Sequence, residues 1–203
     1  MTIIEKVAMP DLKDSEEMVV VIDVIRAFTT AAFVFSNKAE KIVLVKDVEE
    51  AFELKRGHPD WLLMGEMNGQ IPPGFDLGNS PLEVFRASLD GKTLVQRTSC
   101  GTQGVWKASN ASRMFVASFV VAEATFRKIT EIQPITTTLF ITAPAPGGDE
   151  DWAFTEYLEE KLRFGKADSR SYLERVRNSP SGLSFISADF PPEDLYHSQK
   201  IKS

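Results

Sequence analysis

Cysteine and histidine are nearly absent from this chain of 203 residues. Cys100 is the only cysteine, so the chain cannot form an internal disulfide or a metal site built from several cysteines. The histidines, His58 and His197, are too few for a histidine-rich metal centre. Any metal that this protein binds is therefore expected to be held by oxygen ligands.

Long hydrophobic runs are also missing. The longest apolar segment, residues 18–35, contains Asp23 and Arg26, which disfavours a membrane span. Glu5 and Lys6 interrupt the N-terminal apolar stretch, which does not resemble a signal peptide. We therefore expect a cytoplasmic protein with no membrane partner.

Excess positive charge is absent as well. Lysine and arginine number 23 against 29 aspartates and glutamates, which gives a net charge of −6. Such a chain would be repelled by the phosphate backbone of nucleic acid, so we expect no nucleic-acid partner. No P-loop and no G-x-G-x-x-G fingerprint occurs, so nucleotide binding has no motif to support it.

Short apolar runs alternate along the chain with amphipathic stretches. This pattern predicts an α/β fold with a largely parallel sheet flanked by helices. The predicted strands are residues 18–22, 41–45, 61–64, 93–96, 114–117 and 138–141, and the predicted helices are 27–37, 48–56, 81–89, 120–132, 152–164 and 169–177. We expect a single domain over 1–203, with 166–203 as a peripheral C-terminal segment that ends frayed.

Unusual polar groups follow several of these predicted strands. Asp23 and Arg26 follow the first, Glu66 follows the third, and a Thr-Ser-Cys-Gly-Thr stretch at 98–102 follows the fourth. The loop 74–81 adds Asp76, and the sixth strand leads to a turn at 144–149. Ligand crevices of open α/β sheets lie beyond the carboxyl ends of the strands. We therefore expect a site along one edge of one sheet.

Each feature alone has a structural alternative. Asp23 could cap a helix or pair with Arg26 across its first turn, and Asp76 could cap a turn in its loop. Residues 98–102 could be a simple connection, in which Cys100 fills a tight turn as a small residue. Their combination at the strand ends favours a ligand site.

The chemistry of the set indicates a phosphoester. Arg26 can grip phosphate through two nitrogens, and residues 99–101, at the start of a helix, could offer backbone N–H groups to phosphate oxygens. Carboxylates are the ligands that Mg²⁺ prefers. Two phosphatase classes do not fit. Ile25 stands where a haloacid-dehalogenase-type enzyme has its second aspartate, and Trp106 stands where a cysteine phosphatase needs arginine.

Four segments, 21–27, 65–66, 74–81 and 98–102, resemble the 2-phosphosulfolactate phosphatase family in order and spacing. Gly-Phe-Asp-Leu-Gly-Asn-Ser-Pro at 74–81 is the most specific of them. The resemblance extends over about residues 18–165 and implies a fold particular to the family. It also implies a Mg²⁺-dependent phosphatase that converts 2-phosphosulfolactate to sulfolactate and phosphate on the route to coenzyme M. The family's acidic and arginine positions correspond to Asp23, Arg26, Glu66 and Asp76.

The sequence therefore predicts a phosphatase that acts on a small anionic phospho-acid with Mg²⁺ as cofactor, and a homodimer as the assembly to test. Catalysis is assigned to Asp23 and Arg26, and Asp23 is open to roles as metal ligand, base or nucleophile. The metal ligands are Asp76, Glu66 and Asp23. Substrate binding is assigned to Arg26, Asn79, Thr98, Ser99, Cys100, Gly101 and Thr102.

Several positions depart from the family pattern. Phe28 stands where a smaller hydroxyl residue is usual. Cys100 and Val121 stand where asparagine is usual, and Gln103 stands where arginine is common. These departures affect the expected substrate more than the reaction class. They motivate an alternative, in which the chain binds a phospho-acid in the same pocket but has lost turnover.

Overall fold

The structure is a computed structural model that describes residues 2–9, 11–13, 17–143, 147–184 and 192–199. Residues 144–146 of the predicted turn lie outside this range. The strands are β1 (Ile3–Ala8), β2 (Met18–Ile22), β3 (Lys41–Leu44), β4 (Leu62–Gly65), β5 (Thr93–Arg97), β6 (Arg113–Ala117) and β7 (Thr136–Ile141). The helices are α1 (Ala27–Ser36), α2 (Val48–Gly57), α3 (Pro81–Arg86), α4 (Gly101–Lys107), α5 (Ala122–Ile132), α6 (Asp149–Phe164), α7 (Ser169–Asn178), α8 (Pro180–Ser184) and α9 (Pro192–Ser198), with a 3₁₀ turn at Phe119–Val121.

The strands form two sheets. One has the order β1-β7-β2-β6 and the other the order β3-β5-β4, and the neighbouring strands within each sheet are parallel. The α/β class with parallel strands and flanking helices is confirmed, but the expectation of a single sheet was wrong. A continuous apolar run shows that a strand is covered on both faces, yet it does not show which neighbours the strand pairs with.

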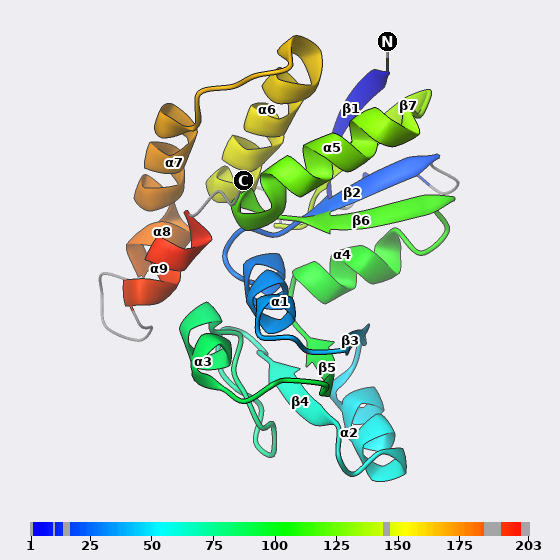
Figure 1. Cartoon of the computed structure of the whole chain (residues 1–203), viewed down its shortest axis with the longest axis vertical. Helices are drawn as coiled ribbons and strands as arrows, with labels where there is room; N and C mark the ends of the chain where they lie inside the picture. The colour runs from blue at the N-terminus through cyan, green and yellow to red at the C-terminus, as the bar shows by residue number, and fades with distance from the viewer. Residues whose placement is uncertain (1, 10, 14–16, 144–146, 185–191, 200–203) are drawn as a thin grey trace.

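Helix α1 lies between the two sheets (Figure 1). Its Phe28 packs with Val19 and Val21 of β2, whereas Phe33 packs with Met64 and Leu94 of the second sheet. Helices α5 and α6 cover the far face of the first sheet, and α2 covers the far face of the second. Helix α1 therefore begins where the two sheets meet.

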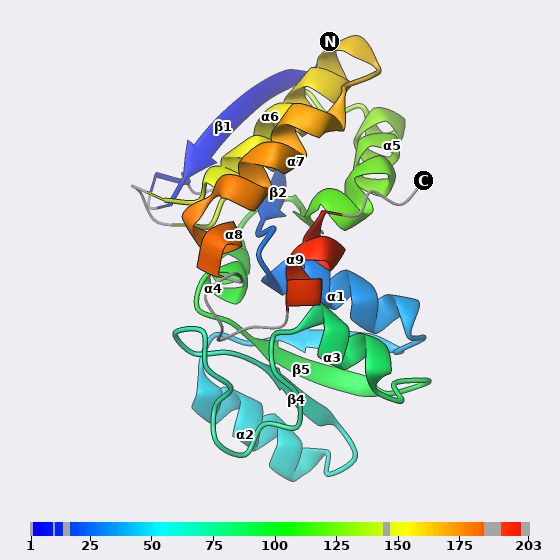
Figure 2. The same ribbon diagram turned by 90° about the vertical axis from the view of Figure 1, so that its left-hand side faces the viewer.

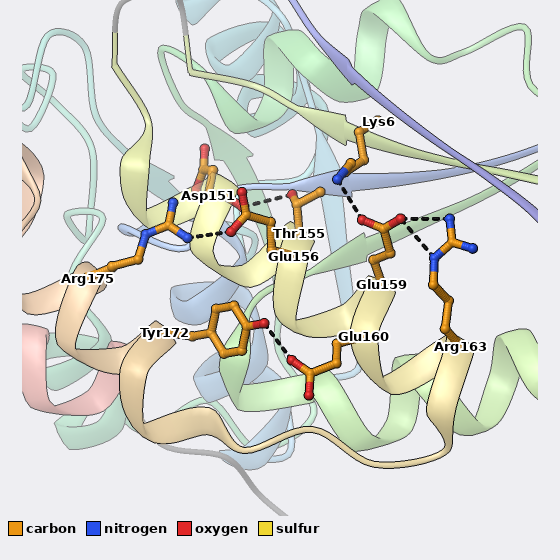
Figure 3. A network of polar contacts seen from close by, with 9 residues as sticks. All are labelled: Lys6, Asp151, Thr155, Glu156, Glu159, Glu160, Arg163, Tyr172 and Arg175. Carbon is orange, nitrogen blue, oxygen red and sulfur yellow. Dashed lines mark hydrogen bonds and ion pairs between the residues drawn. The ribbon is translucent and has the colours of Figure 1, made fainter.

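Polar contacts fasten α6 to its surroundings. Lys6 of β1 pairs with Glu159 of α6, and Arg175 of α7 donates to Glu156 of the same helix (Figure 3). Tyr172 of α7 donates to Glu160. These contacts fix the helix whose first turn carries Glu150 and Asp151.

The C-terminal helix α9 contacts α3, and both lie beside α1 in two orthogonal views (Figures 1 and 2). Asp194 and Ser198 of α9 are fully buried. Over residues 192–199 the chain is therefore not peripheral as the sequence suggested, because Asp194 meets charged and polar partners in the interior. The predicted frayed end, residues 200–203, lies outside the described residues. No helix in the described part of the chain has the length and apolar character needed to cross a membrane.

Candidate active site

The predicted site residues come from the carboxyl ends of strands in both sheets. Asp23 follows β2 of the four-stranded sheet, whereas Glu66 and Ser99 follow β4 and β5 of the three-stranded sheet. All three line one cavity of about 250 Å³. The site therefore lies where two sheets meet and not along the edge of one.

Asp23 is buried beside the first turn of α1. Its Oδ1 accepts a hydrogen bond from the backbone N–H of Ala27 at 2.9 Å, and the backbone N–H of Gly101 donates to the same carboxylate. Burial, the largest effect, raises the pKa of Asp23, the charges of Glu66 and Glu150 raise it further, and the two N–H groups lower it, so that it is about 7. Asp23 thus caps α1, as the structural alternative proposed, and can also exchange a proton near neutral pH.

Glu66 is held by three donors. Its Oε1 accepts from the backbone N–H of Ser99, and its Oε2 accepts from the Ser99 hydroxyl at 3.0 Å and from the backbone N–H of Gly69 at 2.7 Å. These bonds fix the carboxylate in one orientation at the cavity wall. Because a carboxylate oxygen has more than one lone pair, Glu66 can still contact a cation.

The 98–102 stretch does not offer its backbone to a ligand in the way the sequence suggested. The N–H groups of Thr98 and Thr102 bond to each other's side-chain hydroxyls, at 2.9 and 3.0 Å. The N–H groups of Ser99 and Gly101 are used by Glu66 and Asp23. Four of the five residues therefore hold the carboxylates or the turn, and only Ser99 and Cys100 of this stretch line the cavity.

Arg26 stands at the N-terminus of α1, and its Nη1 donates to Oδ2 of Asp194 at 2.8 Å. The side chains of both residues are buried, with 8% of Arg26 and none of Asp194 exposed. The alternative in which Arg26 pairs with Asp23 is therefore replaced by a pair with the C-terminal helix. The sequence did not predict Asp194 as a site residue, because no local pattern indicates that it pairs with Arg26, 168 residues away.

A second cavity of about 490 Å³ adjoins the first, and Arg26, Glu66, Gly69 and Asn79 line both. Asn79 is buried, and its Oδ1 has no hydrogen-bond partner within the described part of the chain. An orphaned amide oxygen at a cavity wall is costly unless a ligand or water meets it. This supports the assignment of Asn79 to substrate binding.

Asp76 lies elsewhere. Its Oδ2 accepts from the backbone N–H of Leu63 at 2.8 Å and pairs with the Lys55 Nζ at 3.5 Å, and the side chain is partly exposed. Asp76 lines neither of the two cavities. The structure therefore does not bring Asp76 together with Asp23 and Glu66. Its side chain instead contacts Leu63 of β4 and Lys55 of α2, which is a structural role but not the turn cap that the sequence offered as the alternative.

Two further carboxylates adjoin the site from the first turn of α6. Asp151 accepts from the backbone N–H of Val24 at 2.8 Å, and Glu150 accepts from the Ser181 hydroxyl at 2.6 Å. Burial, together with the charges of Asp23 and Glu150, raises the pKa of Asp151. Acidic residues such as those at 149–151 are common at the positive, N-terminal end of a helix. Because that role already accounts for them, the sequence does not indicate that they also adjoin the site.

Cys100 is half-buried and lies among these carboxylates. Burial, followed by the charges of Asp23, Asp151, Glu66 and Glu150, raises the pKa of its thiol to about 12. The thiolate needed for nucleophilic attack is therefore scarce at neutral pH.

The donor set fits a magnesium ion held by two carboxylates. Asp23 and Glu66 both place hard carboxylate oxygens at one cavity, and Mg²⁺ often takes only one or two carboxylates plus water and phosphate oxygens. Glu150 and Asp151 add nearby negative charge that a cation would compensate. The predicted set that included Asp76 is not assembled, and within the described residues no three His, Cys, Asp or Glu side chains group as metal ligands.

Comparison with known proteins identifies the family of the chain. The profile of the 2-phosphosulpholactate phosphatase family matches residues 4–178. A probable 2-phosphosulfolactate phosphatase of Bacillus subtilis (strain 168) is 34% identical over 185 residues, which cover 89% of this chain and 81% of that protein. One from Thermotoga petrophila is 35% identical over 167 residues, covering 79% and 71%. One from Caldicellulosiruptor saccharolyticus is 46% identical over 114 residues, covering 56% of this chain and 46% of that protein. The chain belongs to the 2-phosphosulfolactate phosphatase family.

Proposed function

We propose that this protein hydrolyses a small acidic phosphomonoester with the help of Mg²⁺, and that 2-phosphosulfolactate is the first substrate to test. The observation that carries the proposal is the cavity that Asp23, Glu66 and Arg26 line together. It combines two carboxylates with a guanidinium, as expected for a phosphate group bound beside a cation. The names of the relatives support the choice of substrate.

Asp23 and Glu66 are the residues that would hold Mg²⁺. When bound, the ion supplies Lewis-acid stabilisation of negative charge on phosphate oxygens. Glu66 is the better fixed of the two, because three donors orient it. Without a cation the pKa of Asp23 is raised to about 7, and a bound Mg²⁺ would stabilise its ionised form.

Arg26 is proposed to bind the phosphoryl group. A guanidinium can donate two parallel hydrogen bonds to phosphate oxygens, and Arg26 borders both cavities. In the reaction, a water oxygen bonds to phosphorus, the ester P–O bond breaks, and the leaving alkoxide needs a proton. Where Glu66 alone holds the ion, Asp23 is the group suited to take the proton from water and return it to the alkoxide.

The adjoining cavity is proposed to receive the rest of the substrate. It is lined in part by Ile71, Leu82 and Arg86, which combine apolar surface with a cation. Asn79 lies where the cavities meet and can bond a polar group near the ester. A small acid with a second negative group fits this combination.

The departures from the family pattern bear on the alternative of a binding protein without turnover. Gln103 Nε2 donates to the backbone carbonyls of Lys46 and Thr98, at 2.9 and 3.3 Å. Neither Gln103 nor Val121 lines the two cavities. Phe28 also lines neither cavity, so Cys100 alone among these departures borders the site, and the observations favour the phosphatase.

Phosphate release from 2-phosphosulfolactate and from a panel of small phospho-acids tests the proposal. We expect release with Mg²⁺, loss of release after dialysis against EDTA, and recovery when Mg²⁺ is returned. Calorimetric binding of the same compounds is the companion measurement. Binding without release from any compound supports the alternative, and undiminished release in EDTA removes the metal from the proposal.

A further inference from the structure

We propose that Asp194, on the C-terminal helix α9, is a positioning residue that fixes the guanidinium of Arg26 at the wall of the two cavities. The inference rests on the proposed function, because Arg26 is the proposed phosphate ligand. It assigns a role in that site to a helix that contributes no residue to the family motifs of the sequence.

The Asp194 carboxylate is fixed from both of its oxygens. Oδ2 accepts from Nη1 of Arg26 at 2.8 Å. Oδ1 accepts from the Ser80 hydroxyl at 2.9 Å and from the backbone N–H of Leu82 at 2.8 Å. Asp194 therefore connects the start of α1, which carries Arg26, with the start of α3, which carries Ser80 and Leu82.

Burial makes this contact specific. The Asp194 side chain is fully buried, so water does not compete for its oxygens, and Arg26 is almost as buried. An unpaired carboxylate in such a place would be costly, so the pair resists separation. Arg26 is thereby confined to few rotamers, although a free arginine side chain would sample many.

Confinement of Arg26 is what a phosphate site requires. A guanidinium has five N–H donors in a fixed plane, so the bond from Nη1 to Asp194 occupies only part of that capacity. A group that is already oriented loses little entropy when the ligand binds, and small misplacements of such groups lower rates strongly. Asp194 supplies orientation and not attraction, since its own charge would repel phosphate.

A purely structural role for Asp194 makes a different prediction. If the residue only anchors α9 to α3, its loss lowers the melting temperature, and any loss of activity adds to that of an Arg26 variant. If Asp194 acts through Arg26, its loss has no further effect once the arginine fork is gone.

The test is a double-mutant cycle with Asp194→Asn, Arg26→Lys and the combined variant. We expect Asp194→Asn to reduce kcat/KM by about tenfold, and the combined variant to be no slower than Arg26→Lys alone. Ser198→Ala is the matched control. It removes the bond from the Ser198 hydroxyl to the backbone carbonyl of Asp194 within α9, leaves the Asp194 carboxylate unchanged, and should keep the wild-type kcat/KM. Additive losses, or wild-type kinetics for Asp194→Asn, would overturn the inference.

Should Asp194→Asn fail to fold, Ser80→Ala takes its place in the cycle. It leaves Asp194 charged but removes one of the donors that fix it. We expect a loss of about threefold in kcat/KM, and no loss when Arg26 is already lysine. A loss that persists beside Arg26→Lys would count against the inference.

A second readout separates this inference from the proposed function. Affinity for inorganic phosphate, measured by calorimetry, does not need turnover. If the wild-type protein binds phosphate but releases none from any substrate, the proposed function fails, and the affinity still tests Asp194. We expect the Kd for phosphate to rise about tenfold in Asp194→Asn, and an unchanged Kd would refute the positioning role.

Discussion

Asp23 and Glu66 are oriented by backbone N–H groups and a serine hydroxyl, and no cationic side chain within the described residues pairs with either of them. Such donors fix a carboxylate without neutralising its full charge. The site therefore keeps negative charge directed at the cavity, and Arg26 borders the same cavity with its own charge shared with Asp194. At the scale of single residues, this distribution of charge around the cavity determines which substitutions should change activity.

Asp76→Asn is expected to leave the Mg²⁺ requirement within about twofold of the wild type, because Asp76 lines neither cavity. Asparagine can still accept from the Leu63 N–H, and the partly exposed ion pair with Lys55 contributes no more than about 0.5 kcal/mol. A Mg²⁺ titration of phosphate release and a thermal melt measure both effects. A large rise in the Mg²⁺ needed for half-maximal rate would restore Asp76 as a ligand, as the sequence suggested.

Cys100→Ser is expected to keep most of the phosphatase rate. Because the thiol has a pKa of about 12, it stays protonated at the pH of the assay and does not act as a nucleophile. Serine is close in size and can occupy the same turn. Steady-state kinetics, with a melt on the same sample, check the prediction. Complete inactivation of a folded variant, or a phosphocysteine found by mass spectrometry, would show that the thiol reacts.

At the scale of elements, the site depends on the close approach of α4 to α1. A Cβ added at Gly101 would lie 2.5 Å from the Ala27 Cβ and 2.9 Å from Oδ2 of Asp23. The absence of a side chain at Gly101 is what allows its N–H to reach the Asp23 carboxylate.

Gly101→Ala is therefore expected to cost about 1–3 kcal/mol of unfolding free energy and to displace Asp23, with loss of activity. Gly57→Ala, in α2, is the matched control, since nothing lies within 4 Å of its added Cβ. Urea unfolding and phosphate release measure the two consequences. Equal stability of the two variants would mean that α4 shifts without strain.

Some of the helices and strands could be predicted from the sequence, and others could not. The strand at 18–22 and the start of α3, where the Ser80 hydroxyl accepts from the Glu83 N–H, were predicted from local signals and are confirmed. β1 was missed because Glu5 and Lys6 break its apolar pattern at a sheet edge. The division into two sheets and the docking of α9 depend on contacts between distant residues, such as Arg26 with Asp194, which local patterns do not encode.

At the scale of the whole molecule, charges among four buried carboxylates shift pKa values at the site. These carboxylates are Asp23, Glu66, Glu150 and Asp151. Burial is the main cause of the raised pKa of Asp23, to about 7, and of the raised pKa of Asp151. The charges of Glu66 and Glu150 add to it at Asp23, and those of Asp23 and Glu150 add to it at Asp151. In the unfolded chain both groups lose their protons near pH 4. Between about pH 4 and 7, the folded state therefore binds more protons than the unfolded state, so stability falls as pH rises.

The cation-free protein is accordingly expected to melt at a lower temperature at pH 8 than at pH 5. Mg²⁺ should raise the melting temperature more at pH 8, where Asp23 is ionised and can bind it, than at pH 5. Asp23→Asn should flatten the pH dependence of the melting temperature and reduce the effect of Mg²⁺, because it removes one titrating group and one ligand.

Asp168→Asn is the control for this prediction. Its exposed carboxylate has a pKa lowered by the bond from Arg170, so it titrates below this window and should keep the wild-type slope. Thermal melts in EDTA and in Mg²⁺ at both pH values provide the comparison. A melting temperature that rises from pH 5 to pH 8 in EDTA, or a Mg²⁺ effect that survives Asp23→Asn, would show that the buried carboxylates do not control stability in this way.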